Sequence, residues 1–171
     1  MSDATYRLGD ERDRLDDRLD ELADRAAEAD NDAARQTVWQ IARQVEDRLD
    51  GVQYLIDEHS ADATVTVRPL TAGETARIED SMADLQRRSD HSAGGLPGTR
   101  RNHDAAAALV DAPFLDDDVD ADDLDACLPV VADLPTQAVK WLRARADDLS
   151  GIDEGNSKSF DERVAAASSA N

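Results

Sequence analysis

A seven-residue repeat of apolar positions near the N-terminus constrains the fold more than any other feature of this chain. Leu8, Leu15, Leu19, Leu22 and Ala26 are separated by seven, four, three and four residues, and Asp, Glu and Arg fill most of the positions between them. This spacing puts the apolar side chains on one narrow stripe of an α-helix, as in the seam of a coiled coil. Because the stripe is narrow, the helix requires a partner helix to bury it.

A second run with helical spacing follows directly. Its apolar positions are Val38, Ile41, Val45, Leu49, Val52, Leu55 and Ile56. Asn31 or Asp32 is placed to cap this second helix, and Trp39 lies near its apolar stripe. Gly51 lies inside it and costs about 1 kcal/mol relative to alanine. We therefore expect residues 1–60 to form an acidic helical hairpin, with one long helix in an oligomeric coiled coil as the alternative.

One short segment departs from the helical pattern. Residues 64–68, Thr-Val-Thr-Val-Arg, alternate and are rich in β-branched side chains, which predicts a short β-strand. Pro69 ends this strand or confines it to a sheet edge. Thr71 and Glu74 have the spacing of a capping box, which predicts a helix over Ala72–Ser89. The strand requires a pairing partner for its backbone groups, but no second strand stands out in the sequence.

Loops and short helices are predicted for the next part of the chain. Residues 89–101 contain several glycines and are expected to form a flexible loop. The Ala-rich segment that follows predicts a helix over Asn102–Ala112. A short helix is expected around Cys127, with Asp120 or Asp122 as its cap.

The last predicted helix begins near Leu134 and Pro135, is capped by Asp133, and ends at Ser150–Gly151. Residues 152–171 are poor in apolar side chains and are expected to be disordered. The predicted fold is thus mainly α: a hairpin or coiled coil over residues 1–60, followed by a small helical domain over residues 61–151 with one short β-strand.

The charge of the chain excludes several classes of function. There are 39 Asp and Glu residues against 19 Lys and Arg residues, a net charge of −20. Such an excess is tolerated best where salt screens it, so the composition is typical of a cytoplasmic protein from a salt-in halophile such as a haloarchaeon. It argues against nucleic-acid binding, which requires clustered basic side chains. No apolar stretch has the length of a membrane span, so we expect no membrane partner.

No motif for catalysis or metal binding stands out. Asp118, Asp120 and Asp122 match the first three ligands of an EF-hand loop, but Asp123 occupies the position that requires glycine. The three histidines are scattered, and none of them lies in a recognisable nucleophile motif. We therefore expect a protein that is not an enzyme and holds no cofactor or metal.

In the absence of such motifs, we expect the helical surfaces to serve for binding other proteins. The expected partners are another protein and further copies of this chain in a homo-oligomer. A core role is the default interpretation of Trp39 and Trp141. The alternative is that Trp141 belongs to a contact face that enters the groove of a partner helix. The predicted contact residues are Leu134, Val139, Trp141, Leu142, Leu109 and Val110.

Three segments of the chain resemble the tail assembly chaperones of long-tailed viruses and proviruses. These proteins combine a V-x-V-R-x-L-T-x-G-E corner, an L-V-x-x-P segment and a closing L-P…L…L-S-G helix. The matching residues here are Val65–Glu74, Leu109–Pro113 and Leu134–Gly151, so the resemblance covers residues 64–151. It implies a non-catalytic protein that binds the long, apolar tape-measure protein and prevents its aggregation. The alternative is a coiled-coil structural adaptor or virion scaffold protein that assembles through the N-terminal helices.

Overall fold

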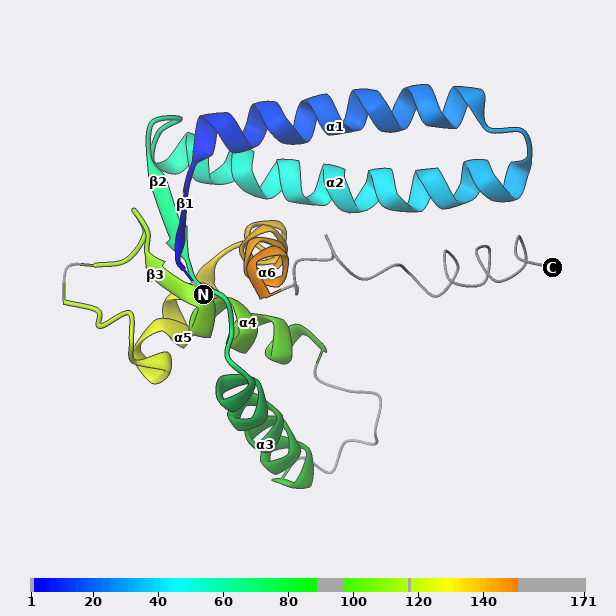
Figure 1. Cartoon of the computed structure of the whole chain (residues 1–171). Helices are drawn as coiled ribbons and strands as arrows, with labels where there is room; N and C mark the ends of the chain where they lie inside the picture. Colours follow the sequence, from blue (N-terminus) through cyan, green and yellow to red (C-terminus); the bar gives the residue numbers. More distant parts are fainter. Residues whose placement is uncertain (1, 89–96, 117, 151–171) are drawn as a thin grey trace, which may run out of the picture.

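The computed structural model describes residues 2–88, 97–116 and 118–150 of the chain. Its architecture is mainly α-helical with one small antiparallel sheet (Figure 1), which confirms the predicted fold class. The predicted tail, residues 152–171, lies outside the described residues, as does most of the predicted loop, residues 89–101. The end of that predicted loop, residues 97–101, is instead the first part of a helix.

The N-terminal part of the chain is a helical hairpin, which confirms one of the two alternatives for residues 1–60. Helices α1 (Leu8–Glu28) and α2 (Asp32–Glu58) run side by side in opposite directions (Figure 1). Asn31 caps α2, as expected, because its side-chain oxygen accepts a hydrogen bond from the Ala34 backbone amide at 2.8 Å. The seam buries leucines of α1 against valines and a leucine of α2: Leu8, Leu15, Leu22, Val38, Val45, Val52 and Leu55.

The β-branched run is the central strand of a three-stranded sheet. Strand β2 (Thr64–Val67) pairs with β1 (Ala4–Arg7) on one side and with β3 (Leu109–Asp111) on the other, and both pairings are antiparallel. A register shift between Thr66 and Val67 interrupts the pairing with β3. Val65 and Val67 are fully buried, so one face of this strand belongs to the core.

The prediction of a single strand is therefore wrong. β1 has four residues and continues directly into α1, so the heptad pattern of the helix hides it. β3 has three residues and continues directly from α4 (Pro97–Ala108), whose alanines extended the predicted helix to Ala112. Strands this short are specified by the partner that pairs with them, because their own residues carry too little alternation to be recognised.

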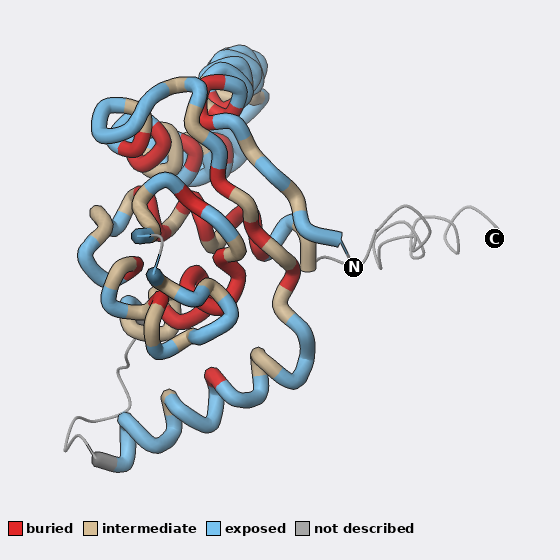
Figure 2. The backbone as a smooth tube through the Cα atoms, turned by 90° about the vertical axis from the view of Figure 1, so that its left-hand side faces the viewer, coloured by how far each residue is buried: buried red, intermediate tan, exposed pale blue. Residues whose placement is uncertain are grey.

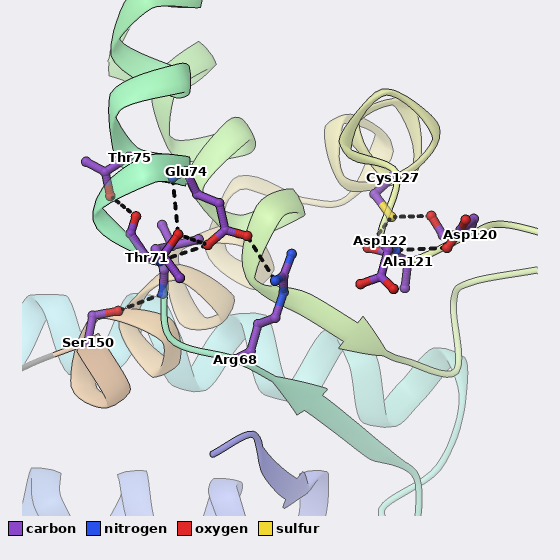
Figure 3. Close-up of polar contacts among 10 residues, drawn as sticks. Arg68, Thr71, Glu74, Thr75, Asp120, Ala121, Asp122, Cys127 and Ser150 are labelled. Carbon is purple, nitrogen blue, oxygen red and sulfur yellow. Dashed lines mark hydrogen bonds and ion pairs between the residues drawn. The ribbon is translucent and has the colours of Figure 1, made fainter. Parts of the chain in front are cut away.

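Helix α3 (Ala72–Arg88) extends away from the rest of the molecule (Figures 1 and 2). Its start follows the predicted capping box: the Thr71 hydroxyl accepts from the Glu74 backbone amide at 3.2 Å, and the Glu74 carboxylate accepts from the Thr71 amide at 2.8 Å. Glu74 also pairs with Arg68 at 2.9 Å (Figure 3). Ile78 is the only side chain of Ala72–Arg87 classed as buried, so capping and charge pairing contribute much of what holds this helix.

Helices α5 (Leu124–Asp133) and α6 (Thr136–Ser150) complete the fold. Asp123, and not Asp120 or Asp122, caps α5, and its carboxylate accepts from the Asp125 amide at 3.0 Å. The predicted capping role of Asp133 for the final helix is also wrong, because Asp133 is the last residue of α5 and α6 begins three residues later.

Cys127 is fully buried in α5, where it packs as a small core residue. Its Sγ lies 3.6 Å from the backbone oxygen of Asp120 (Figure 3). Burial raises the pKa of this thiol, and the charges of Asp123, Asp120 and Asp122 act in the same direction. The thiol therefore stays protonated at neutral pH and has the character of a packing group.

Helix α6 packs against both α2 and α4 and thereby joins the hairpin to the remaining elements. Gly51 makes this possible. A Cβ atom at Gly51 would lie 2.4 Å from the carbonyl carbon and oxygen of Gln137, closer than any side chain could approach. One hydrophobic cluster accordingly contains residues from both sides of position 60. The hairpin and the following elements thus share a core.

Candidate partner-binding site

The predicted contact face on the last helix does not face solvent in this structure. Trp141, Leu142 and Leu109 are fully buried and Val139 is 2% exposed. Leu134 and Val110 are half-buried. The structure brings these residues to the inner side of α6, β3 and the α5–α6 junction, where the chain covers them with its own helices. For Trp141, the default interpretation as a core residue is confirmed.

A buried polar network explains why Trp141 lies inside. Its indole N–H donates to the Glu11 carboxylate at 3.0 Å, and its ring meets the Tyr6 ring edge to face at a centroid distance of 6.5 Å. Arg145 makes a cation–π contact with Tyr6, and its guanidinium carbon lies 5.5 Å from the centroid of the Tyr6 ring. The only aromatic N–H of α6 is therefore satisfied by an acid of α1.

Glu11 is the centre of this network. Arg14 donates two hydrogen bonds to it, at 3.0 and 3.1 Å, and Arg145 lies 3.6 Å away. Burial acts to raise the pKa of the Glu11 carboxyl, but the hydrogen bonds from Arg14 and Trp141 and the charge of Arg145 outweigh it, so that pKa lies below its ordinary value. The ionised carboxylate thus fastens α1 to α6. It is a structural group with no open access to a substrate.

Trp39 is the tryptophan that faces solvent. Its exposed fraction is 57%, the largest among the exposed bulky apolar side chains of the described residues, so the default core role is wrong for it. Beside it lies an apolar groove of about 520 Å³ between α1 and α2. We call this the tip groove, and its lining residues are Leu19, Asp20, Leu22, Ala23, Ala26, Ala27, Arg35, Val38, Trp39, Ala42 and Glu46.

The tip groove is open because the hairpin is longer than the helix that covers it. The end of the hairpin with the α1–α2 turn extends past α6 (Figure 1). α6 meets the other half of α2, where Gly51 lies against Gln137 and Lys140 pairs with Asp47. A pair of helices buries only the sides that face each other. At the tip, the alanines of α1 and α2 thus leave a shallow channel that no third helix within residues 2–88, 97–116 and 118–150 fills.

The surroundings of the tip groove are acidic. Residues 16–46 contain nine Asp and Glu residues and four arginines, a net charge of −5. Arg35 is held within the hairpin, because it pairs with Asp32 at 3.1 Å and donates to the backbone oxygens of Ala26 and Ala29. The apolar channel is therefore edged mainly by carboxylates. The guanidinium of Arg35 is engaged within the hairpin and is not free to bind an acidic partner.

The other polar groups do not converge on a reaction site. His103 is 9% exposed, and its Nδ1 lies 2.8 Å from the Thr99 backbone oxygen. Burial raises the pKa of Asp104, although Arg143 and Arg100 act in the opposite direction. Over residues 2–88, 97–116 and 118–150, no three His, Cys, Asp or Glu side chains are grouped so that they could hold a metal ion. Among the helices described, none has the length and apolar character needed to cross a membrane.

Sequence reasoning missed the tip groove because it assigned the contact face to Trp141 and not to Trp39. The difference between them comes from tertiary packing: Trp39 is 57% exposed near the end of the hairpin, whereas Trp141 is fully buried in α6, and no local signal in the sequence separates them. Comparisons with protein-family models, with curated proteins and with solved structures gave no match. The function is therefore inferred from the geometry of the molecule itself.

Proposed function

We propose that this chain is a non-catalytic assembly protein that binds an amphipathic helix of a partner protein in the tip groove. The observation that carries the proposal is the exposure of Trp39 beside an apolar channel of about 520 Å³. A large exposed aromatic side chain next to small residues is an arrangement typical of a protein contact, since it offers apolar area and a place for the partner's side chains.

The shape of the groove favours a helix as the occupant. Its floor runs along two antiparallel helices, with Leu22 and Val38 buried at the bottom and Ala23, Ala27 and Ala42 at the sides. Small side chains let a third helix approach closely, and side chains of its apolar stripe would fill the channel as in helix-in-groove recognition. A helix bound there would complete a three-helix arrangement over the exposed part of the hairpin.

The charge of the tip selects the partner further. With a local net charge of −5, the rim favours a helix whose apolar stripe is flanked by Lys or Arg. A second copy of this chain is a less favourable occupant, because each copy carries −20 and the two would repel unless concentrated salt screened them. The homo-oligomer expected from sequence is thus the rival occupant of the same groove.

The resemblance of residues 64–151 suggests a more specific form of this function. We propose that the protein acts as a tail assembly chaperone in a high-salt cytoplasm, with an apolar, helical tape-measure protein as the client. The acidic exterior supports this role, because a strongly charged cover keeps a bound apolar client dispersed. The coiled-coil adaptor is the second candidate and uses the same exposed hairpin.

A binding experiment in molar potassium chloride tests the proposal. The probe is a synthetic amphipathic helix with a Leu/Ala stripe flanked by lysines, labelled for fluorescence anisotropy. We expect saturable binding by the full-length chain, and at least about tenfold weaker binding by Trp39→Ser, because truncation of a central aromatic anchor costs about 2 kcal/mol or more. A peptide with glutamates in place of the lysines should bind more weakly than the lysine peptide.

The matched control is Tyr54→Ser, since Tyr54 is an exposed aromatic residue of the same helix that does not line the groove. This variant should bind the peptide as the wild type does. Equal binding by the Trp39→Ser and Tyr54→Ser variants would refute the site. A dimer in sedimentation velocity that dissociates on Trp39→Ser would instead identify a second copy as the occupant and favour the adaptor.

A further inference from the structure

A second concave site lies on the opposite half of α2, where α2, α4 and α6 meet. It is a pocket of about 230 Å³. Its charged lining consists of Arg48, Arg101, Lys140, Arg143, Asp47 and Asp147. Because a water molecule takes up about 30 Å³ in the liquid, the pocket is large enough for a polyatomic anion.

The balance of charge in this pocket is opposite to that of the chain. Four cations and two carboxylates line it, whereas the whole chain has about twice as many acids as bases. The two carboxylates are already engaged: Asp47 pairs with Lys140, and Asp147 lies 3.5 Å from Arg143. Four cations around one small volume repel each other, so an anion between them would lower the free energy.

Arg48 and Arg101 are the two cations of this pocket that have no partner among the residues the structure describes. Within the described part of the chain, neither of them makes an ion pair or a side-chain hydrogen bond, and both are half-buried. They come from α2 and α4, so the pocket holds free guanidinium groups on two separate helices. Arg25, Arg43 and Arg77 likewise make no ion pair among the described residues, but they are exposed, whereas Arg48 and Arg101 are half-buried beside the same pocket.

Arg143 is anchored at the wall of the pocket. Its Nε lies 3.4 Å from the carboxylate of buried Asp104 and 3.5 Å from that of Asp147. Neither contact has the geometry of a hydrogen bond, and this Nε is buried without a hydrogen-bond partner. The guanidinium is thus held by one carboxylate of α4 and one of α6, while its hydrogen-bonding capacity is not fully used.

We propose that this pocket binds a phosphate group, with Arg48 and Arg101 as the principal ligands and Lys140 and Arg143 as supporting cations. Guanidinium groups present paired N–H donors that match the oxygens of phosphate, and such charge-assisted bonds are stronger than neutral ones. A monovalent halide can use only the charge and not the paired donors. A nucleic-acid backbone is disfavoured, because the many acids outside the pocket would repel its neighbouring phosphates.

Calorimetric titration of the full-length chain with inorganic phosphate and, separately, with glycerol 3-phosphate tests the site in potassium chloride at fixed ionic strength. We expect saturable binding of one anion per chain. Arg48→Gln and Arg101→Gln should each weaken it at least about tenfold, because each removes hydrogen bonds to a charged group. Tighter binding of inorganic phosphate would identify the free ion as the ligand, and tighter binding of the ester would identify a phosphorylated metabolite.

Arg43→Gln is the matched control, since Arg43 is an exposed arginine of α2 that does not line the pocket. It should bind both anions as the wild type does, and so should Trp39→Ser, which separates this site from the tip groove. Circular dichroism confirms that each variant is folded, and Arg48→Lys should recover part of the affinity by restoring the charge. Absence of saturable binding to the wild type, or equal weakening by Arg43→Gln, would overturn the proposal.

Discussion

The indole N–H of Trp141 donates a hydrogen bond to the carboxylate of Glu11 at 3.0 Å, although 130 residues separate them in sequence. This contact joins the first helix to the last. It lies within a buried group of charges that includes Arg145, whose side chain is 8% exposed. The carboxylate of Glu11 thus holds the hairpin against α6.

Glu11→Gln should lower the free energy of unfolding by about 2 kcal/mol at neutral pH, because it removes one of the two carboxylates that compensate buried Arg145 and weakens the hydrogen bonds from Arg14 and Trp141. The other carboxylate, that of Asp148, lies 2.7 Å from Arg145 and remains. Chemical denaturation measures this loss. The matched control is Glu21→Gln, in which the lost ion pair with Arg18 is exposed and contributes at most about 1 kcal/mol. Equal losses in the two variants would show that Glu11 is not the centre of the network.

The pH dependence of stability should report the same carboxylate. The folded-state pKa of Glu11 is below its ordinary value of 4.5, so protonation is harder in the folded state than in the unfolded state. The stability that Glu11 contributes is therefore complete above that value and is lost as the pH falls through the folded pKa. Denaturation curves at a series of pH values should show the gap between wild type and Glu11→Gln narrowing on acidification. A gap that stays constant far into acid would contradict this assignment.

Gly51→Ala should destabilise the protein, in contrast to the usual effect of this substitution within a helix. Alanine has the higher helix propensity by about 1 kcal/mol, but its Cβ would lie 2.4 Å from the backbone of Gln137 and force α2 and α6 apart. We expect a net loss of about 2 kcal/mol or more in the free energy of unfolding. Thermal and chemical denaturation measure it.

Gly73→Ala provides the control for that substitution. Gly73 lies in the first turn of α3, where the nearest atom to an added Cβ is the Thr71 hydroxyl at 3.9 Å. There the substitution should be neutral or stabilising by up to about 1 kcal/mol. A stabilising effect of Gly51→Ala would mean that α6 does not approach α2 as closely as described.

The capping box should govern the stability of α3. Thr71→Ala removes the hydroxyl that accepts from the Glu74 amide, at a cost of about 1 kcal/mol. Because α3 buries so little, we expect local opening, seen as roughly fivefold faster hydrogen exchange of its amides. Exchange in α1 and α2 should not change. Thr37→Ala, which removes an exposed hydroxyl from α2, should leave α3 exchange as it is in the wild type.

The sequence predicted those parts of the fold that depend on residues close together in the chain. The heptad spacing predicted the seam of the hairpin, Asn31 predicted the start of α2, and Thr71 with Glu74 predicted the start of α3. Each of these depends on side chains within one or two turns of helix. The sequence also showed that Gly51 lowers the helix propensity of α2. The reason for a glycine at this position, the close approach of Gln137 in α6, lies about 86 residues further along the chain.

Features set by distant partners were missed. β1 and β3 exist because β2 lies between them, and neither has a pattern of its own that separates it from the adjoining helix. The two tryptophans differ because α6 covers one half of α2 and not the other. Burial of Trp141 and exposure of Trp39 are thus consequences of tertiary packing, which helical periodicity alone does not specify.

The most direct test follows the two indole N–H resonances of the ¹⁵N-labelled chain during addition of the lysine-flanked amphipathic helix. The chain has only two tryptophans, so Trp39→Phe assigns both signals. If the tip groove receives the partner, the Trp39 signal shifts and saturates while that of Trp141, held by Glu11, stays in place. Saturable binding that leaves the Trp39 signal unmoved would contradict the proposed site.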